Sequence, residues 1–507
     1  MALPILGGVF VAVAVAALWS LNPLWVGFVL FGVAACVPAF MVRRGSGYWL
    51  AVFLLVLPFN LHKFFGTKEH VAKLLETVGG TAGTTTPLLE VSDLAFLMML
   101  VVWFVRRLDA RARLFLPRIS VLPLAYLLWV LLGALFAPLP SLSAFEVLRQ
   151  AKFFVIYLFT SCVVRPRREG KLILGVLLLG LALQSVVTLV RYESQQVSAL
   201  FGGTFGEIGE SFDVTEDARL ESVTRDEAGE ASATRRGTGT FPHPNSTAMH
   251  LALTLPMALA LIMIGKWRTE KWLYLALAGA GAAALYTTFS RSSMAGFMVS
   301  LVVCLSVAFW RGIISRQVFL AACCVAAILA PAMVFEAHSY LTSRSDYSEA
   351  HLSHLKAGIQ MIRISPLLGV GLNNSTPLRE QFTPGGESLV EKSVPLHSHY
   401  LLQAVETGLV GFVLYYLFFA LVCREAIRQC RLGDVYGTAF GLGVLGAYTA
   451  IAVATITDYP GADALQTFLW FYAGLIVGLR REERDAASSD LAPGPAHRPA
   501  SAAGRGR

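Results

Sequence analysis

Three side chains suited to acid–base or electrostatic chemistry stand at the ends of long apolar stretches. Arg236 precedes a segment that leads into one stretch, Arg291 stands at the end of another, and His397 comes just before a third. The guanidinium fork keeps its charge and binds phosphate oxygens in pairs, and imidazole accepts a proton near pH 7. Two arginines facing one cavity can stabilise a diphosphate leaving group, while the histidine takes a proton from an attacking hydroxyl. The pattern predicts group transfer from a diphosphate.

The same residues have structural interpretations that stay open at this point. An arginine at a helix end often extends its charged head to the lipid headgroups, which is the alternative for Arg291 and for Arg235, the neighbour of Arg236. A histidine at the membrane interface is structural more often than catalytic. His399 follows His397 by two positions, so the sequence leaves open which imidazole accepts the proton.

The apolar stretch after His397 carries further candidates. Glu406 lies about two helical turns inside it, where a carboxylate either orients a neighbouring group or faces the headgroups. Gly408 and Gly411 come next, and small residues of this kind let membrane helices approach each other closely. These residues are predicted to support the site rather than to react.

Metal and nucleic-acid chemistry are not predicted. His351 and His354 are spaced i and i+3, but no acidic ligand joins them or the later histidines at a recognisable spacing. All 7 cysteines fall in predicted spans or on the basic side of the membrane, so neither a disulfide framework nor a cysteine metal site is expected. The net charge of +8 is spread over short loops instead of forming a patch. The protein is therefore predicted to need no cofactor.

The elements that must position these residues are membrane helices. Hydrophobic residues make up 55% of the 507 residues, and the mean hydropathy is +0.62, which excludes an ordinary soluble domain. An apolar run of roughly 17–25 residues can cross a bilayer, and about fourteen such runs occur. They lie near 2–19, 22–41, 48–62, 88–105, 119–137, 146–164, 171–191, 246–264, 272–290, 294–310, 317–336, 399–423, 436–457 and 463–479. The sequence predicts an all-α polytopic membrane protein.

Basic residues indicate the direction of the helices. Every second connection carries Lys or Arg, whereas the short connections between them, such as 138–141 and 457–462, carry none. Because Lys and Arg in short loops stay in the cytoplasm, both termini are predicted to be cytoplasmic. Three long segments then lie on the outer side, at 63–87, 192–245 and 337–398.

The third outer segment contains a predicted amphipathic helix. Leu352, Leu355, Ile359 and Ile362 share one face at helical spacing. The pattern predicts a helix over Ser348–Arg363, with its first residue as the N-cap. Such a helix lies on the membrane surface or covers a cavity.

Four stretches resemble motifs of the O-antigen ligase and O-antigen polymerase superfamily, a group of bacterial membrane glycosyltransferases. Arg236–Asn245 resembles its Arg–Gly–Phe–Pro–Asn segment, Thr288–Ser292 its Thr–x–Ser–Arg span end, and Pro366–Gly371 its Pro-x-x-Gly-x-Gly loop. His397–Gly408 resembles its histidine motif, with Ser in place of the usual Asn after the histidine. The resemblance covers about residues 230–420 and depends on the order, spacing and shared outer placement of the stretches.

The resemblance implies transfer of glycan from undecaprenyl diphosphate at the periplasmic face of the bacterial inner membrane. It implies that Arg236 and Arg291 bind the diphosphate and that His397 activates the acceptor, without a metal ion. The supporting residues predicted for this site are His399, Glu406, Gly408, Asn245, Arg149 and Lys152. The last two stand where the family often has basic residues near the start of a span.

The resemblance also divides the chain. The predicted divisions are N-terminal membrane helices with an acidic periplasmic loop at 1–230, a ligase- or polymerase-like core at 231–425 with a catalytic periplasmic loop at 337–398, C-terminal membrane helices at 426–483 and a disordered cytoplasmic tail at 484–507.

The acceptor and the class of protein leave alternatives. A polymerase joins lipid-linked repeat units of O-antigen or exopolysaccharide, works beside a flippase and a chain-length regulator, and is favoured by the high span count. A ligase moves finished glycan to lipid A–core. The alternative of another class is a secondary transporter, which commonly holds ionisable residues near the membrane midplane, whereas Glu406, Asp458 and Asp463 lie towards the outer ends of their spans.

Overall fold

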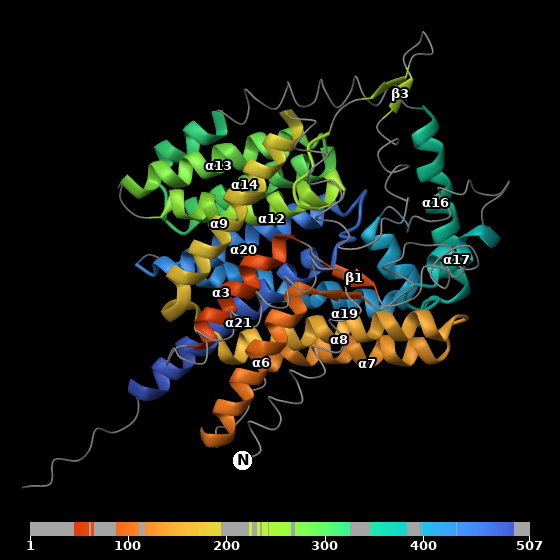
Figure 1. Cartoon of the computed structure of the whole chain (residues 1–507), viewed down its shortest axis with the longest axis horizontal. Coiled ribbons are helices and arrows are strands. Elements are labelled where there is room, and N and C mark those ends of the chain that lie inside the picture. The colour runs from red at the N-terminus through yellow and green to blue at the C-terminus, as the bar shows by residue number, and fades with distance from the viewer. Residues whose placement is uncertain are drawn as a thin grey trace, which may run out of the picture.

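The fold is almost entirely helical (Figure 1). The structure, a computed structural model, describes residues 45–59, 62–64, 88–110, 117–193, 223–225, 231–233, 236–241, 243–264, 269–324, 345–382, 396, 398–431 and 433–490. Within these ranges, two short antiparallel pairs join β1 (His62–Phe64) to β2 (Leu88–Glu90) and β3 (Val223–Arg225) to β4 (Ala231–Ala233). The all-helical prediction is confirmed for the remainder, and the strand pairs were not predicted.

The helices follow one another with few long insertions. In chain order they are α3 (Gly45–Val56), η1 (Leu57–Phe59), α6 (Val91–Ala110), η2 (Arg118–Ser120), α7 (Val121–Leu135), α8 (Pro140–Val163), α9 (Pro166–Glu193), α12 (Pro244–Met263), α13 (Thr269–Thr287), α14 (Arg291–Trp310), α16 (Ser345–Ile364), α17 (Ser375–Arg379), η3 (Glu380–Phe382), α19 (His399–Gln429), α20 (Val435–Ala454) and α21 (Asp463–Asp490). Proline begins α8 and α12, where its missing N–H loses no hydrogen bond. Ser398 and Asp434 cap α19 and α20 by accepting from the N–H of Leu401 and Gly437.

Six segments of the described ranges are long and apolar enough to cross a bilayer: Arg118–Leu135, α9, α12, α14, α19 and α20. All six coincide with predicted spans. Helices α8, α13 and α21 also form where spans were predicted, and α8 carries Glu146, Arg149 and Lys152 between its start and its middle. The total of about fourteen spans stays a prediction.

Several predictions concern residues outside the described ranges. They are the spans 2–19 and 22–41, the end of the span 317–336, most of the acidic segment 192–245, Arg235 and His397. The tail prediction is partly wrong, because α21 continues to Asp490, past residue 484 where disorder was expected. An apolar helix that leaves a membrane can continue into water when charged residues cover it.

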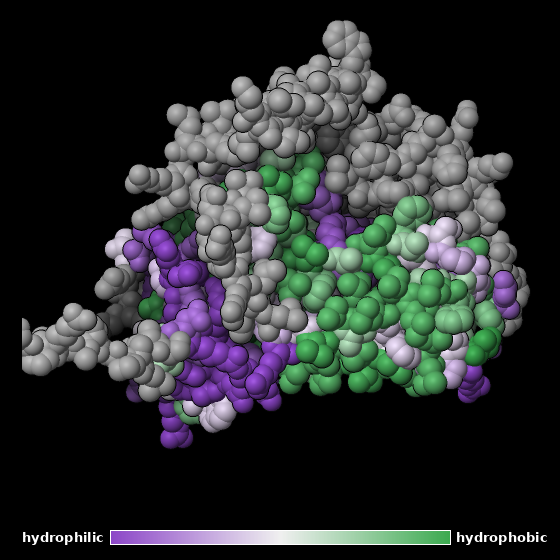
Figure 2. All heavy atoms as spheres, turned by 90° about the horizontal axis from the view of Figure 1, so that it is seen from below, coloured by the Kyte–Doolittle hydropathy of each residue, from purple (hydrophilic) through white to green (hydrophobic). Residues whose placement is uncertain are grey.

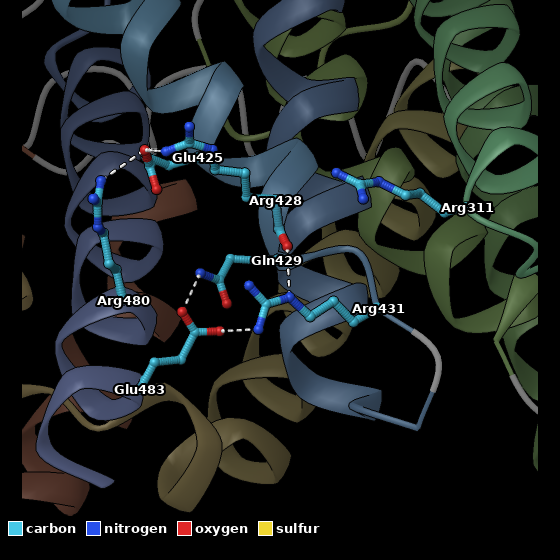
Figure 3. Close-up of a pocket in the computed structure, with 7 residues that line it drawn as sticks. All are labelled: Arg311, Glu425, Arg428, Gln429, Arg431, Arg480 and Glu483. Atoms are coloured by element: carbon cyan, nitrogen blue, oxygen red, sulfur yellow. Dashed lines mark hydrogen bonds and ion pairs between the residues drawn. The ribbon is translucent and has the colours of Figure 1, made fainter. Parts of the chain in front are cut away.

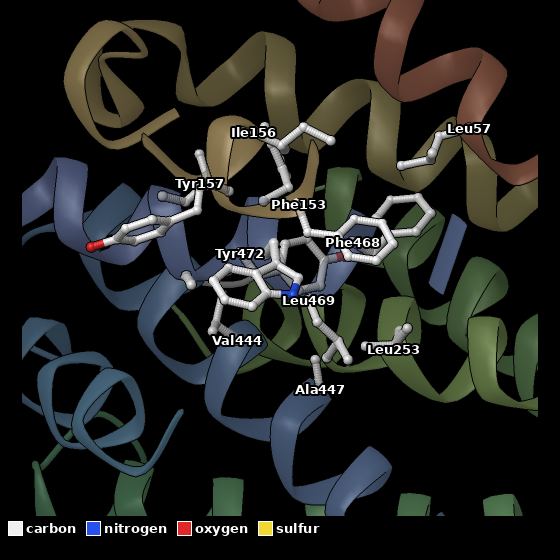
Figure 4. Packing of buried hydrophobic residues seen from close by; sticks show 14 of the residues in the cluster. Leu57, Phe153, Ile156, Tyr157, Leu253, Val444, Ala447, Phe468, Leu469 and Tyr472 are labelled. Atoms are coloured by element: carbon white, nitrogen blue, oxygen red, sulfur yellow. The ribbon is translucent and has the colours of Figure 1, made fainter. Parts of the chain in front are cut away.

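The centre of the bundle is formed by α12 and α20, the two candidate spans with the largest buried share (Figure 1). Helix α14 packs along α20, and α21 packs along α8. Where α8, α12, α20 and α21 meet, Phe153, Leu253, Val444 and Phe468 interlock (Figure 4). This packing brings the first turn of α21 to the charged first half of α8, although the two lie far apart in the sequence.

The outside of the bundle is apolar where lipid chains would lie. On α7, Leu128, Leu131, Leu135 and the following Phe136 are exposed. The molecule shows a broad hydrophobic face (Figure 2). A hydrophilic end borders this face (Figure 2). Large apolar faces of this kind mark membrane contact in a protein that must satisfy its backbone internally.

The predicted amphipathic helix is α16, but its start was wrong. Ser348 is not the N-cap, because the helix already begins at Ser345. Leu352, Leu355 and Ile359 of the predicted stripe are exposed. The face that packs on α19 is formed by Ala357, Gly358 and Met361. The helix therefore presents one apolar face to the bundle and another to its surroundings.

Candidate functional site

The connection between α20 and α21, residues 455–462, joins most of the elements that carry predicted site residues. The N–H of His399 points at two carbonyl oxygens of this connection, each 3.1 Å away. The Asp458 carboxyl lies within reach of the Arg236 charge and of the Asn245 side chain. The first residue of α21 forms ion pairs with two cations of α8. One short connection thus gathers α8, α12, α19 and α21.

Arg236 is held against the turn between α13 and α14. Its Nε donates to the carbonyl oxygen of Thr288 at 2.8 Å, and its Nη2 donates to Oδ1 of Asn245 at 2.6 Å. The N–H of Gly237 donates to the carbonyl oxygen of Thr287 at 2.7 Å. A Cβ at Gly237 would lie 2.6 Å from Thr287 Oγ1, so only glycine permits this approach. These bonds orient the guanidinium group.

The same turn carries Arg291. Phe289 has a φ of 50°, a left-handed conformation that a bulky residue adopts only where its surroundings enforce it. The N–H of Ser290 donates to Thr288 Oγ1 at 3.2 Å and closes the turn. Arg291 then begins α14 and is exposed. The two predicted diphosphate ligands therefore belong to one local structure, with Arg236 bound to a residue three positions before Arg291.

Of the two candidate histidines, the structure describes His399 but not His397. His397 lies outside the described residues, so its predicted role stays a prediction. His399 is buried, with 7% of its surface exposed. Its ring lies 5.9 Å from that of Tyr415 and 6.4 Å from that of Tyr416. This packing gives His399 a structural position inside the bundle.

Gly408 interrupts α19, a feature that the sequence did not predict. Its φ is 67° and its ψ is 177°, a region that only glycine occupies readily. The interruption leaves backbone groups of α19 without partners inside the helix, and the 366–371 loop forms hydrogen bonds with them. The N–H of Val370 donates to Val405 at 2.9 Å, and the N–H of Leu409 donates to Pro366 at 2.8 Å. Irregular backbone at membrane depth is tolerated when protein covers it in this way.

Gly411, in contrast, matches the close-packing interpretation. A Cβ at Gly411 would lie 2.6 Å from the side chain of Thr407 and 3.1 Å from that of Trp129 on α7. Helices α7 and α19 are thus in close contact at this point.

The Glu406 side chain holds the segment that follows the 366–371 loop, residues 373–375. Its Oε1 accepts from the Ser375 hydroxyl at 2.6 Å, and the backbone amides of Asn373 and Ser375 also bond to the carboxyl. Asn373 Nδ2 donates to Glu146 of α8 at 3.4 Å. Glu406 is 6% exposed, so it orients neighbouring groups and does not face the headgroups.

Arg149 and Lys152 lie in a network of carboxylates. Arg149 pairs with Glu146 at 2.5 Å and with Asp463 at 3.2 Å. Lys152 pairs with Asp463 at 2.8 Å and with Asp93 at 3.2 Å. Their charges are compensated by these partners, as buried charges require. Both cations therefore position α6, α8 and α21 around the site.

A family model described as O-antigen ligase matches residues 273–416. These residues are similar to an O-antigen ligase domain. This match confirms the resemblance to that superfamily. No protein with a curated description matches the chain.

The matched region runs from α13 into α19 and includes Arg291, the 366–371 loop and Gly408. Arg236 and Arg149 come from segments before this region, and Asp463 comes from a segment after it. The candidate site therefore draws residues from both sides of the matched region.

Burial shifts the pKa of two titratable groups near Arg236. Burial raises the pKa of the Asp458 carboxyl to about 6, against the lowering effects of the Tyr459 amide, Asn245 and Arg236. Burial and the Arg236 charge lower the pKa of His243 to about 4. His243 is therefore neutral at pH 7, and its Nδ1 accepts from the N–H of Asn245 at 3.1 Å. This bond caps α12 and fixes the residue that holds Arg236.

Sequence analysis gave no site role to Asp93, Asp458 or Asp463. A signal existed, because charged residues inside a span need partners of opposite sign, and Arg149 and Lys152 lie inside one. The acidic residues near the outer ends of other spans are the available partners. The sequence alone does not determine which of them pairs with Arg149 or Lys152.

Two alternatives gain no support from these observations. Among the described residues, no group of three His, Cys, Asp or Glu side chains is placed to hold a metal ion, and the side chain of His351 lies outside them. The match to the O-antigen ligase domain does not favour a secondary transporter.

Proposed function

We propose that the protein is a membrane glycosyltransferase that transfers glycan from undecaprenyl diphosphate to a hydroxyl acceptor at the periplasmic face of the inner membrane. The observation that carries the proposal is the bond from Arg236 to the turn that begins with Thr288 and ends at Arg291. It supports a single anion-binding structure built from two separate segments of a chain with a region similar to an O-antigen ligase domain.

In the proposed reaction, the acceptor oxygen forms a bond to the anomeric carbon of the donor glycan. The bond between that carbon and the diphosphate oxygen breaks, and its electron pair stays with the diphosphate. Arg236 and Arg291 stabilise the charge on the leaving group. His397 accepts the proton of the acceptor hydroxyl. The proposed transfer needs no metal ion.

The acceptor that we favour is another lipid-linked repeat unit, which makes the protein a polymerase of O-antigen or exopolysaccharide, with a flippase and a chain-length regulator as partners. The alternative is a ligase that uses lipid A–core as acceptor, and the description of the matched family supports it. A deletion strain separates the two. Single capped repeats indicate a lost polymerase, and accumulated lipid-linked polymer indicates a lost ligase.

The test of the site uses purified protein with a lipid-linked donor and measures product formation. We expect Arg291→Ala to lower the rate by about 100-fold, because it removes one leaving-group contact, and His397→Asn to abolish turnover. Arg316→Ala is the matched control, since Arg316 is exposed beyond the other end of α14. Wild-type rates for Arg291→Ala or His397→Asn, with normal protein levels, would exclude that residue from the reaction.

A further inference from the structure

A second polar cluster lies at the other end of α19 and encloses a pocket of about 350 Å³. Its lining residues are Arg311, Glu425, Arg428, Gln429, Arg431, Arg480 and Glu483 (Figure 3). After the interruption at Gly408, helix α19 continues as far as Gln429, which is roughly 30 Å of helix. The pocket and the candidate site therefore lie on opposite sides of a hydrocarbon core about 30 Å thick.

The carboxylates of this arginine pocket are shared among several cations. Glu425 is 3% exposed and accepts from Arg428 and Arg480, each at 2.7 Å, and from Arg424 at 3.5 Å. One carboxylate thus serves three guanidinium groups. Two of the three line the pocket.

The second carboxylate is shared in the same way. Glu483 accepts from Arg431 at 3.3 Å and from Arg167 at 3.2 Å. Arg311 extends from the end of α14 towards the end of α19 (Figure 3). Among the described residues, no carboxylate pairs with Arg311, and its buried Nε has no hydrogen-bond partner. Four arginines against two glutamates leave the lining of the pocket with excess positive charge.

The pocket lies at the depth of lipid headgroups. Trp310, next to Arg311, is 71% exposed, and Trp272 near the start of α13 is 66% exposed. Tryptophan prefers the membrane–water interface. The Arg311 guanidinium stacks on the Trp310 ring at 4.7 Å, which ties the pocket to that interface.

We propose that the arginine pocket binds the phosphate-bearing headgroup of an anionic membrane lipid, on the face opposite the candidate site. The retention of positive residues on the cytoplasmic side explains why arginines occur here. It does not explain why four of them converge around one hollow with too few carboxylates to neutralise them. A phosphate oxygen accepts paired bonds from such guanidinium groups, and a lipid supplies it at this depth.

The test is lipid binding by the purified full chain in neutral detergent, measured by native mass spectrometry. We expect phosphatidylglycerol to bind at least about tenfold more tightly than zwitterionic phosphatidylcholine, and Arg311→Gln to weaken phosphatidylglycerol binding by roughly five- to tenfold. Arg424→Gln is the matched control, because it removes the same charge from the same end of α19 but does not line the pocket. Its effect should stay below about twofold.

Three results would overturn the proposal. The first is equal affinity for the two lipids. The second is an equal loss of phosphatidylglycerol affinity with Arg424→Gln. The third is binding of inorganic phosphate alone where phosphatidylglycerol does not bind. The last result would assign the pocket to a soluble phosphate compound. Melting temperature and monodispersity check that each variant is folded. If Arg311→Gln does not fold, Arg431→Gln removes another lining guanidinium and should weaken binding by the same factor.

Discussion

The interruption of α19 at Gly408 can be tested with one methyl group. In Gly408→Ala, the new Cβ would overlap the carbonyl group of Leu367 and lie 2.7 Å from the N–H nitrogen of Gly369. Both contacts are to backbone, which cannot rotate away as a side chain can. The 366–371 loop must therefore move away from α19, or the helix must change its path.

The size of the effect follows from two contributions. Holding a non-glycine residue in this backbone region costs about 1–3 kcal/mol, and overpacking of a filled site costs about 1–3 kcal/mol more. The sum is about 2–6 kcal/mol, and its lower end already corresponds to more than tenfold in an equilibrium constant. Because Glu406 and its bond to Ser375 depend on this loop, we expect glycan transfer to fall by at least about tenfold.

The assay compares product formation and melting temperature for Gly408→Ala and Gly279→Ala. Gly279 lies in α13, and a Cβ there would meet no atom within 4 Å, so alanine should leave both quantities unchanged or raise the melting temperature slightly. If Gly408→Ala keeps wild-type turnover and melting temperature, the interruption is not needed to hold the loop, and the explanation given for Gly408 is wrong.

Three other outcomes are expected. Asp463→Asn removes the 4%-exposed carboxylate that pairs with both Arg149 and Lys152, and it should lower the free energy of unfolding by about 3 kcal/mol. Asp485→Asn, at an exposed position of α21, should not. Equal melting temperatures for the two variants would contradict this. Burial raises the pKa of Asp458 to about 6 from an ordinary 3.8. Its contribution to stability is therefore complete below about pH 4 and is lost as pH rises through 6. Asp458→Asn should remove that loss in melting curves recorded between about pH 4 and about pH 7, and an unchanged slope would refute it. EDTA should leave product formation intact, and loss of activity restored by a divalent ion would replace the metal-free reaction.

The positions of the helices could be predicted well from sequence. The predicted span 246–264 corresponds to α12 (Pro244–Met263), and 294–310 corresponds to α14 (Arg291–Trp310). Length and apolarity determine such elements, because a backbone in lipid must satisfy its own hydrogen bonds. The ends were less accurate, as in α16, where capping depends on local contacts.

The pairing between elements could not be predicted. Gly408 was interpreted as a small residue for close packing, since a positive φ leaves no mark on hydrophobic periodicity. Asp463 was recognised as a charge near a span end, but its partners on α8 depend on how α21 packs. The motif residues Arg236 and Asn245 were chosen for a shared site, and their direct bond is a tertiary contact that no spacing rule contains.

The ion pair between Lys152 and Asp463 has a consequence for synthesis of the protein. Its two residues are separated by 311 positions, so the ribosome delivers α8 long before it delivers the carboxylate that Arg149 and Lys152 share. Before that, Glu146 and Asp93 are the carboxylates that pair with the two cations. The ion pairs that join α8 to α21 can therefore form only late in synthesis.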